Sequence, residues 1–381
     1  MTAGDRTSVV IVGAGVFGAS TASALARRGV DVTLVERIAP GHVRSSSGAP
    51  SRVLRCGHGD DVWHTRWARD ARTRWLELGE EHGVELFVRT GVVWLAHRED
   101  GVEAASERTL AAEGVAAERL SPEETARLFP SLVTDDLAFG LLEPDAGALR
   151  AAPGVRTLVA DAERHGARLV TGTATPTSDG GVAVSGVRLD VDRVVWASGP
   201  WLPLLVGDRI GLTVTRQESV HLGTGPEWAA GRVPTWVDYD HAVYGIGDLD
   251  GQGWKIAPDT EGPPMDPDTA DRRPTDAAVA RAREHVAARF PSLVDAPVVQ
   301  TSVCQYTLTA DTRFVLAPLD EGGPDGPRTW VAGGGSGHGF KHGPVLGEHV
   351  ADLVLGVRDP EAMFGLGRRD PAVKLRTAGA D

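Results

Sequence analysis

Three glycines near the N-terminus have the spacing of a turn that binds a pyrophosphate. Gly13, Gly15 and Gly18 form the pattern G-x-G-x-x-G between a β-branched run and a helical segment, and Glu36 follows 23 positions after Gly13. The first glycine permits a tight turn, the second lets a phosphate approach the backbone, and the third lets the helix pack closely. Glu36 would accept hydrogen bonds from ribose hydroxyls. The motif predicts a dinucleotide site, although it does not separate NAD from FAD.

Four later segments carry side chains suited to redox and anion chemistry. Thiolates attack electron-poor carbons, arginine forks bind carboxylates, and a fixed lysine stabilises developing negative charge. The segments are Ser51-Arg-Val-Leu-Arg55, Tyr244-Gly-Ile-Gly-Asp-Leu-Asp-Gly-Gln-Gly-Trp-Lys255, Cys304-Gln-Tyr-Thr-Leu-Thr-Ala-Asp311 and Ser336-Gly-His-Gly-Phe-Lys341. Together with the glycine motif they resemble the monomeric sarcosine oxidase and N-methyltryptophan oxidase family, within the D-amino-acid-oxidase-like fold.

This resemblance implies FAD as the cofactor, bound covalently through the sulfur of Cys304 to the methyl group at flavin C8, an 8α-S-cysteinyl bond. Such a thioether raises the oxidising power of the flavin, and nearby positive charge favours the reactive thiolate. An inert buried cysteine is the alternative reading of Cys304. Cys56 has no comparable surroundings in the sequence and is expected to be structural.

The resemblance also implies a clamp for an anionic substrate. Arg55 and Lys341 would hold the substrate carboxylate, and Arg52 would lie near the flavin ring. A planar guanidinium suits this role because it can bind both carboxylate oxygens. The alternative is that these residues are ordinary surface cations, with Lys341 exposed in a flexible loop.

By the same resemblance, Tyr244 and Tyr306 border the substrate amine, and Lys255 activates O2 on the other face of the flavin. A lysine at a strand edge is the alternative for Lys255. The chain departs from the family pattern near Gly48 and at Asp259, where family members often carry histidine. Sarcosine itself is therefore in doubt, and a larger or cyclic amino acid is equally open.

The expected cofactor contacts extend beyond the glycine motif to a serine run and several glycine-rich turns. These cofactor-binding residues are Gly13, Gly15, Val16, Phe17, Gly18, Glu36, Arg37, Ser45, Ser46, Ser47, Arg52, Thr175, Ser198, Gly199, Trp201, Cys304, Gly335, Gly337, Gly339, Phe340 and Lys341.

The function implied is an FAD-dependent amine oxidase that converts a small secondary amine, or an N-methyl or cyclic amino acid, to an imine while O2 becomes hydrogen peroxide. One alternative is a covalent-flavin amino acid dehydrogenase, or an imine-forming tailoring enzyme, that passes electrons to another acceptor. A nicotinamide dehydrogenase and a non-catalytic flavoprotein are the other readings.

The elements that must position these residues follow from hydrophobic periodicity. Strands over residues 8–12 and 32–36 flank a helix over residues 16–28, which makes a βαβ unit. Ser121 and Glu124 form a capping box. Residues 258–274 are expected to form a surface loop, and the chain beyond residue 359 a tail. Further helices are expected over residues 64–78, 122–129, 152–165, 276–290 and 344–355, and further strands over residues 86–95, 168–173, 182–187, 191–197, 243–256 and 329–332.

These elements predict an α/β chain of two domains, in which a Rossmann-like FAD-binding domain carries an inserted substrate domain with a mixed or antiparallel sheet. The FAD-binding domain is expected to comprise residues 1–88, 146–216 and 313–381. The substrate domain is expected to comprise residues 89–145 and 217–312.

Composition limits the partners and the location. A net charge of -13 argues against binding to nucleic acid. Two cysteines favour a reducing compartment, and no stretch reaches the ~20 apolar residues that span a bilayer. A cytoplasmic monomer that acts on a small amine and O2 is expected. No metal is expected, because no His, Cys or carboxylate cluster has ligand spacing in the sequence.

Overall fold

A parallel sheet is built around the first strand of the chain. The computed structural model describes residues 7–323, 326–367 and 369–371. The sheet has the order β19-β20-β13-β1-β2-β9, in which β19 alone runs antiparallel to its neighbour. Its strands are apolar runs because both faces are covered, one by long helices and the other by a small sheet and a short helix. The strands are β1 (Ser8–Val12), β2 (Asp31–Glu36), β9 (Arg168–Thr171), β13 (Arg193–Trp196), β19 (Val315–Pro318) and β20 (Thr329–Gly333).

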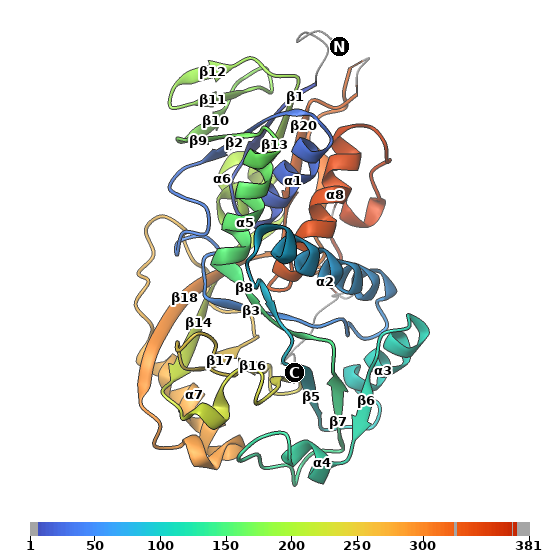
Figure 1. Cartoon of the computed structure of the whole chain (residues 1–381). Coiled ribbons are helices and arrows are strands. Elements are labelled where there is room, and N and C mark those ends of the chain that lie inside the picture. Colours follow the sequence, from blue (N-terminus) through green and yellow to red (C-terminus); the bar gives the residue numbers. More distant parts are fainter. Residues whose placement is uncertain (1–6, 324–325, 368, 372–381) are drawn as a thin grey trace.

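A second, mixed sheet of eight strands has the order β18-β14-β17-β16-β15-β5-β7-β6. Only β15 and β5 pair in parallel, and the other neighbours are antiparallel. Figure 1 shows the parallel sheet in the upper part of the molecule and the mixed sheet in the lower part. The strands are β5 (Val92–Ala96), β6 (Glu118–Leu120), β7 (Phe139–Glu143), β14 (Leu212–Leu222), β15 (Thr235–Asp238), β16 (Val243–Ile246), β17 (Trp254–Pro258) and β18 (Val298–Thr309).

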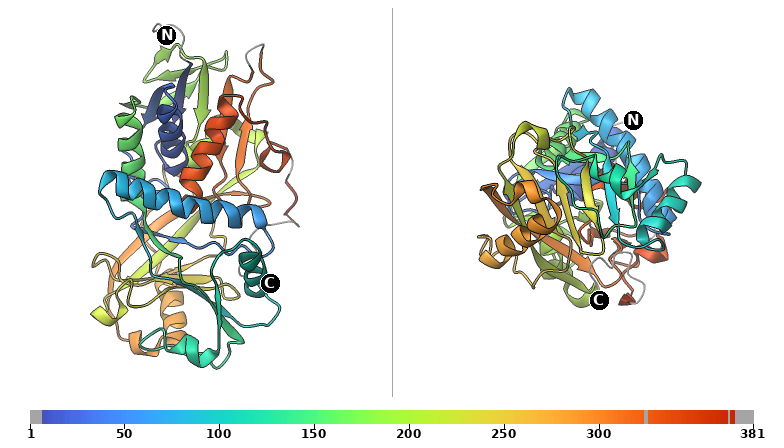
Figure 2. Two further views of the ribbon diagram at one scale, coloured as in Figure 1. Left: turned by 45° about the vertical axis from the view of Figure 1, so that its right-hand side comes forward. Right: turned by 90° about the horizontal axis from the view of Figure 1, so that it is seen from below.

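Two small sheets and the helices complete the fold. In Figure 2, the long helix α2 crosses the molecule between the two large sheets. The small sheets contain β3 (Ser51–Leu54), β4 (Phe87–Val88) and β8 (Gly147–Arg150), and β10 (Ala174–Pro176), β11 (Val182–Val184) and β12 (Val187–Leu189). The helices are α1 (Val16–Arg27), α2 (Val62–His82), α3 (Val102–Ala112), α4 (Pro122–Ala126), α5 (Ala151–Arg164), α6 (Leu202–Val206), α7 (Asp276–Arg289) and α8 (Gly343–Val354).

The predicted fold class is confirmed, and so are the βαβ unit and the four helices now called α2, α5, α7 and α8. The capping box is confirmed as well: Ser121 accepts from the Glu124 N–H, and the Glu124 carboxylate accepts from the Ser121 N–H. The helix that follows it is shorter than predicted and ends at Ala126. No helix within the described ranges is long and apolar enough to cross a membrane.

Three predicted strands prove to be pairs of strands. The segment 86–95 splits into β4 and β5 around Gly91, whose φ is +72°. The segment 243–256 forms the hairpin of β16 and β17, with Asp250 and Gly251 both at positive φ. The segment 182–187 reverses at Ser185 and Gly186 for the same reason. Positive φ values interrupt an extended strand, and alternation of apolar residues does not reveal them.

The expected tail is wrong for the part that the structure describes. Phe364 is fully buried in the core of the parallel-sheet half, and Arg369 forms an ion pair of 3.0 Å with Asp311. Residues 1–6 and 372–381, which the domain prediction includes, lie outside the described residues. The predicted boundary between residues 216 and 217 falls within β14, and the division into domains stays a prediction.

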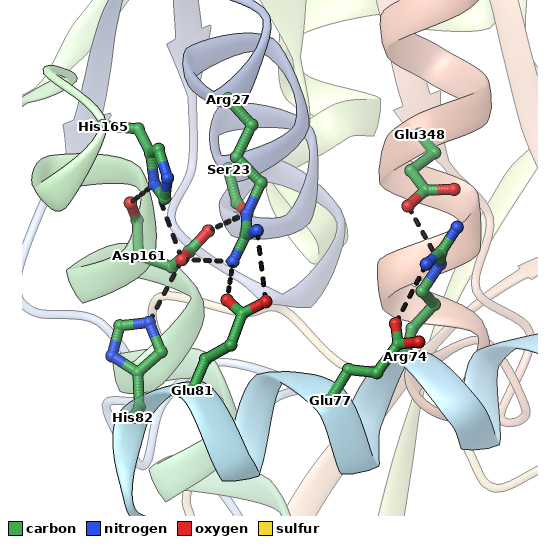
Figure 3. A network of polar contacts seen from close by, with 9 residues as sticks. All are labelled: Ser23, Arg27, Arg74, Glu77, Glu81, His82, Asp161, His165 and Glu348. Carbon is green, nitrogen blue, oxygen red and sulfur yellow. Dashed lines mark hydrogen bonds and ion pairs between the residues drawn. The ribbon is translucent and has the colours of Figure 1, made fainter.

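One buried carboxylate ties the helices of the upper half together (Figure 3). Asp161 of α5 accepts from Ser23 (2.5 Å) and Arg27 (2.6 Å) of α1, and from His82 (3.1 Å) at the end of α2. Burial raises the pKa of Asp161, but the hydrogen bonds from Arg27, Ser23 and His82 outweigh it and hold the pKa at about 2. This network joins α5 to α1 and to the C-terminal end of α2.

Asparagine has nearly the same shape as aspartate but carries no charge, so Asp161→Asn removes only the charge of this side chain. We expect Asp161→Asn to lower the free energy of unfolding by about 2–3 kcal/mol near neutral pH, because Arg27 and His82 lose an ionic partner. A depressed carboxyl pKa stabilises the fold above its ordinary value of 3.8, and this contribution disappears as the pH falls toward about 2. Free energies of unfolding from urea titrations of the wild type and the variant should therefore converge as the pH falls over that range. A difference that does not change with pH would contradict the ionic role of Asp161.

Candidate functional site

The predicted glycine turn lies between β1 and α1 and leaves no room for side chains. Gly13 has a φ of +104°, and a Cβ atom there would lie 2.7 Å from the carbonyl oxygen of Ala197. A Cβ atom on Gly18 would lie 1.9 Å from the carbonyl oxygen of Gly13, so the helix packs directly on the turn. These close contacts are the physical reasons for glycine at both positions.

The start of α1 lines a cavity of about 370 Å³. The N–H of Val16 donates to the hydroxyl of Ser47 (3.1 Å), and no side chain among the described residues caps the helix from Gly15. Glu36 accepts from the N–H of Ala14 (2.9 Å) and that of Ile38 (3.0 Å), which fixes its carboxylate at the cavity wall. The start of a helix at a glycine turn, with a fixed acid beside it, fits the pyrophosphate and ribose of a dinucleotide.

The cavity gathers nearly all of the predicted cofactor residues from distant parts of the chain. The exceptions are Gly18, which lies beneath the turn, and Cys304 and Lys341, which lie farther along at a second cavity. The predicted residues that line the first cavity are Gly13, Gly15, Val16, Phe17, Glu36, Arg37, Ser45, Ser46, Ser47, Arg52, Thr175, Ser198, Gly199, Trp201, Gly335, Gly337, Gly339 and Phe340, together with Tyr306.

A second, smaller cavity of about 80 Å³ adjoins the first. Arg52, Tyr306, Gly337 and Phe340 line both, so the two cavities share a wall. All of the predicted substrate-binding and catalytic residues line this second cavity: Arg52, Arg55, Tyr244, Lys255, Tyr306 and Lys341. Sequence positions from 52 to 341 therefore meet at one end of the dinucleotide cavity.

Arg55 and Lys341 form a pair of buried cations. Their exposed fractions are 7% and 3%, so the reading of both as surface residues is wrong. The Lys341 ammonium donates to the carbonyl oxygen of Arg55 (3.0 Å), and Arg55 donates to the carbonyl oxygen of Gly57 while lying 4.4 Å from the Trp94 ring centroid. Burial lowers the pKa of Arg55, and burial and the charge of Arg55 lower the pKa of Lys341 well below its usual value.

A buried carboxylate holds the loop that carries Arg55. Glu143 at the end of β7 accepts from the N–H groups of Cys56 (2.7 Å) and Gly57 (3.2 Å) and from the Trp94 indole (2.9 Å). It also raises the pKa of Arg55, which partly offsets burial. One carboxylate beside two buried cations leaves a local excess of positive charge, which an anionic ligand would compensate.

Lys255 lies on the other side of the second cavity, in the middle of the mixed sheet. Only 4% of it is exposed, its ammonium donates to the carbonyl oxygen of Ser51 (3.4 Å), and it lies 5.2 Å from the Tyr244 ring centroid. Burial, together with the charge of Arg52, lowers the pKa of Lys255 to about 7. A lysine whose pKa lies near the working pH is a candidate functional group.

The two cysteines have contrasting surroundings. Cys304 in β18 is half-buried, and the Arg52 guanidinium lies 3.6 Å from its sulfur. Cys56 is fully buried, and burial together with the charge of Glu143 raises the pKa of its thiol to about 12. Cys304 therefore has the neighbouring cation that a reactive thiol needs, and Cys56 remains a neutral thiol.

The predicted loop at residues 258–274 is confirmed, and it also covers the cofactor cavity. Asp268 lines this cavity and forms an ion pair of 2.7 Å with Arg37, whose guanidinium lies 4.7 Å from the Trp201 ring centroid. Arg44 donates to the carbonyl oxygen of Asp268 (2.7 Å). The sequence did not identify Asp268, because nothing local distinguishes it from the other acids of the loop.

Other residues of the second cavity were also missed. Gln217 and Ser219 reach it from β14, opposite Cys304 and Ser302 of β18. Asp259, identified from the sequence only as a departure from the family pattern, also lines this cavity. Its carboxylate accepts a hydrogen bond from the Tyr306 hydroxyl (3.4 Å). Only the pairing of β14 with β18 reveals these neighbours, and that pairing is not visible in either strand alone.

Known proteins share this architecture. The profile of the family described as FAD dependent oxidoreductase (DAO) matches residues 8–353. The monomeric sarcosine oxidase of Streptomyces avermitilis is 29% identical over 91% of this chain and 93% of its own length, and the N-methyl-L-tryptophan oxidase of Salmonella heidelberg is 26% identical over 92% and 95%. The L-proline dehydrogenase structure from P. horikoshii superposes with a TM-score of 0.82 at 21% identity, covering 95% of this chain and 97% of that one.

These matches confirm the resemblance drawn from the motifs and decide between a nicotinamide and a flavin cofactor. The family match spans the glycine turn, both large sheets and the two cavities. The chain belongs to the DAO family of FAD-dependent oxidoreductases.

Proposed function

We propose that this protein oxidises the carbon–nitrogen bond of a small secondary amine that carries a carboxylate, with O2 as the electron acceptor. The observation that carries this proposal is the pair of buried cations, Arg55 and Lys341, beside the end of the dinucleotide cavity. The names of two relatives support it, because sarcosine and N-methyl-L-tryptophan are both N-methyl amino acids.

The first cavity would hold FAD through its backbone and its fixed acid. The turn at Gly13 and Gly15 and the start of α1 would bind the pyrophosphate, and Glu36 the ribose hydroxyls. The turn of Gly335, Gly337 and Gly339 would bind the flavin end. FAD supplies the acceptor for a hydride from the carbon next to nitrogen and returns the electrons to O2.

The second cavity would orient the substrate. Arg55 and Lys341 would bind the carboxylate, and Tyr244 and Tyr306 would border the amine, which fixes one carbon–hydrogen bond toward the first cavity. Asp259 lies beside Tyr306 in the second cavity, where its carboxylate would attract the cationic form of the substrate amine. The substrate is therefore an amino acid substituted on nitrogen, and a ring or a larger side chain is allowed.

The test is to mix the holoenzyme anaerobically with N-substituted amino acids and follow the loss of flavin absorbance. Sarcosine, N-methyl-L-tryptophan and L-proline each have a matched amine without the carboxylate. We expect at least one acid to bleach the flavin and its decarboxylated partner to react ~10²-fold more slowly, because the cation pair has lost its ligand. Equal rates for acid and amine, or no bleaching by any amine, would overturn the proposal.

We also propose that Cys304 bonds covalently to the flavin. The half-buried thiol lies next to Arg52 and lines the cavity that adjoins the dinucleotide cavity. Forming the thioether would release the thiol hydrogen and one methyl hydrogen as two protons and two electrons, which O2 would accept to become hydrogen peroxide. The tether would hold the flavin in place and raise its reduction potential.

Acid denaturation distinguishes a tethered flavin from a free one. We expect the precipitated wild-type chain to stay yellow, and Cys304→Ser to release its flavin into the supernatant, because serine forms no thioether with the methyl group. Cys56→Ala is the matched control and should stay yellow. Free flavin in the wild-type supernatant would exclude the covalent bond.

Lys255 is proposed to promote the reaction with O2. In its charged form it would stabilise the superoxide that forms on one-electron transfer, and Lys255→Met should slow reoxidation of the reduced enzyme by ~10²-fold or more. Because the pKa of Lys255 is about 7, the reoxidation rate of the wild type should fall as the pH rises through this value and the lysine loses its charge. The reoxidation rate of the variant should not change over this pH range. Stopped-flow mixing with O2 measures both. An unchanged rate in the variant would favour a dehydrogenase with another electron acceptor.

A further inference from the structure

Four histidines that are far apart in the sequence meet behind the cation pair. His58 precedes α2, His64 lies in its first turn, and His338 and His342 flank Lys341 on the glycine-rich turn. All four are buried. The six distances between their ring centroids lie between 5.4 and 6.1 Å, so the rings occupy the corners of a nearly regular tetrahedron.

In three of these histidines one ring nitrogen, called the outer nitrogen here, has a hydrogen-bond partner outside the cluster. That partner fixes the position of the ring's N–H proton, and the other ring nitrogen is the inner one. His58 Nδ1 lies 2.8 Å from the carbonyl oxygen of Cys56, and His338 Nε2 lies 2.9 Å from that of Thr312. His64 Nδ1 lies 3.0 Å from the Asp61 carboxylate. A proton held on the outer nitrogen leaves a lone pair on the inner one, as in most histidine ligands of metals.

The inner nitrogens have no partner within the described part of the chain. These buried atoms are His58 Nε2, His64 Nε2, His338 Nδ1 and both ring nitrogens of His342. Buried polar atoms in native proteins are nearly always hydrogen-bonded or bound to an ion, since bare ones are costly. One water could donate only two hydrogens to these atoms, whereas a metal ion accepts a lone pair from each ring.

We propose that this cluster binds a divalent transition metal ion of the zinc class, with His58, His338 and His342 as ligands and His64 as the fourth. The ligand atoms of the first three lie within 4.8 Å of one another. A tetrahedron with the observed edges has its centre about 3.5 Å from each ring centroid. A zinc–nitrogen bond of about 2.1 Å puts the metal about 3.2 Å from the centroid of a ring whose nitrogen points at it. The ring centroids therefore lie near the distance that zinc requires, and binding would draw the nitrogens of His58, His338 and His342 together and turn the ring of His64, which lies outside that 4.8 Å set, toward them.

Nearby charges act on this site in both directions. Burial and the charges of Lys341 and Arg55 lower the pKa of His58, His338 and His342, which keeps the rings neutral and their lone pairs available. The same cations repel a dication, and the carboxylate of Asp61 behind His64 opposes that repulsion. The metal would join the start of α2 to the turn that carries Lys341, which is a structural role.

The test is the metal content of the holoenzyme, purified without a histidine tag, incubated with zinc chloride and passed through gel filtration. We expect about one zinc ion per chain by elemental analysis, and Co²⁺ in its place should show the visible bands of a tetrahedral site. His342→Leu should lose the metal. His241→Asn is the matched control, because it removes a histidine from a separate cluster with His97 and Asp238.

Retained flavin shows that each variant is folded. The proposal is overturned if the wild type holds no more zinc than His342→Leu, or if His241→Asn rather than His342→Leu loses it. If His342→Leu does not fold, two measurements on the wild-type protein decide whether the metal site exists. A tetrahedral cobalt spectrum and a melting temperature lowered by a chelator support the site, and the absence of either excludes it.

Discussion

Two buried cations, Arg55 and Lys341, lie side by side at one end of a dinucleotide cavity, and the surrounding structure compensates their charge only in part. Lys341 donates to the backbone of Arg55, and Glu143 fixes the loop beneath them. Burial of two like charges is costly unless a ligand of opposite charge binds there. The position of this pair thus defines where an anionic substrate must sit relative to the cofactor.

The rest of the fold serves to bring this pair and the cofactor cavity together. Arg55 follows β3, Lys341 follows β20, and α2 crosses between the two large sheets. The Trp75 indole of α2 donates to the carbonyl oxygen of Lys341 (2.8 Å), so the same helix that Asp161 holds at one end supports the turn that carries Lys341. The network in Figure 3 therefore contributes to the site from a distance.

The features that could be predicted from the sequence are local or carried by a family pattern. Gly18 could be predicted because the contact that requires it, with Gly13, is local, whereas Gly13 was predicted through the glycine motif, since its contact with Ala197 lies far along the chain. Arg55 and Lys341 were found only through the resemblance, and nothing in the sequence indicated their burial. The residues that were missed meet across long separations: Glu143 binds Cys56 at 87 positions, and Asp268 binds Arg37 at 231. The histidine cluster was missed because its spacing is purely spatial.

The central claim is that the cation pair recognises an anion beside the flavin. The most direct measurement titrates the holoenzyme with propionate, which carries no amine to oxidise, and with propionamide, while the visible absorbance of the flavin is recorded. We expect a saturable change with propionate, none with propionamide, and none with either when Arg55 and Lys341 are both replaced by methionine. Equal responses to the acid and the amide would contradict it.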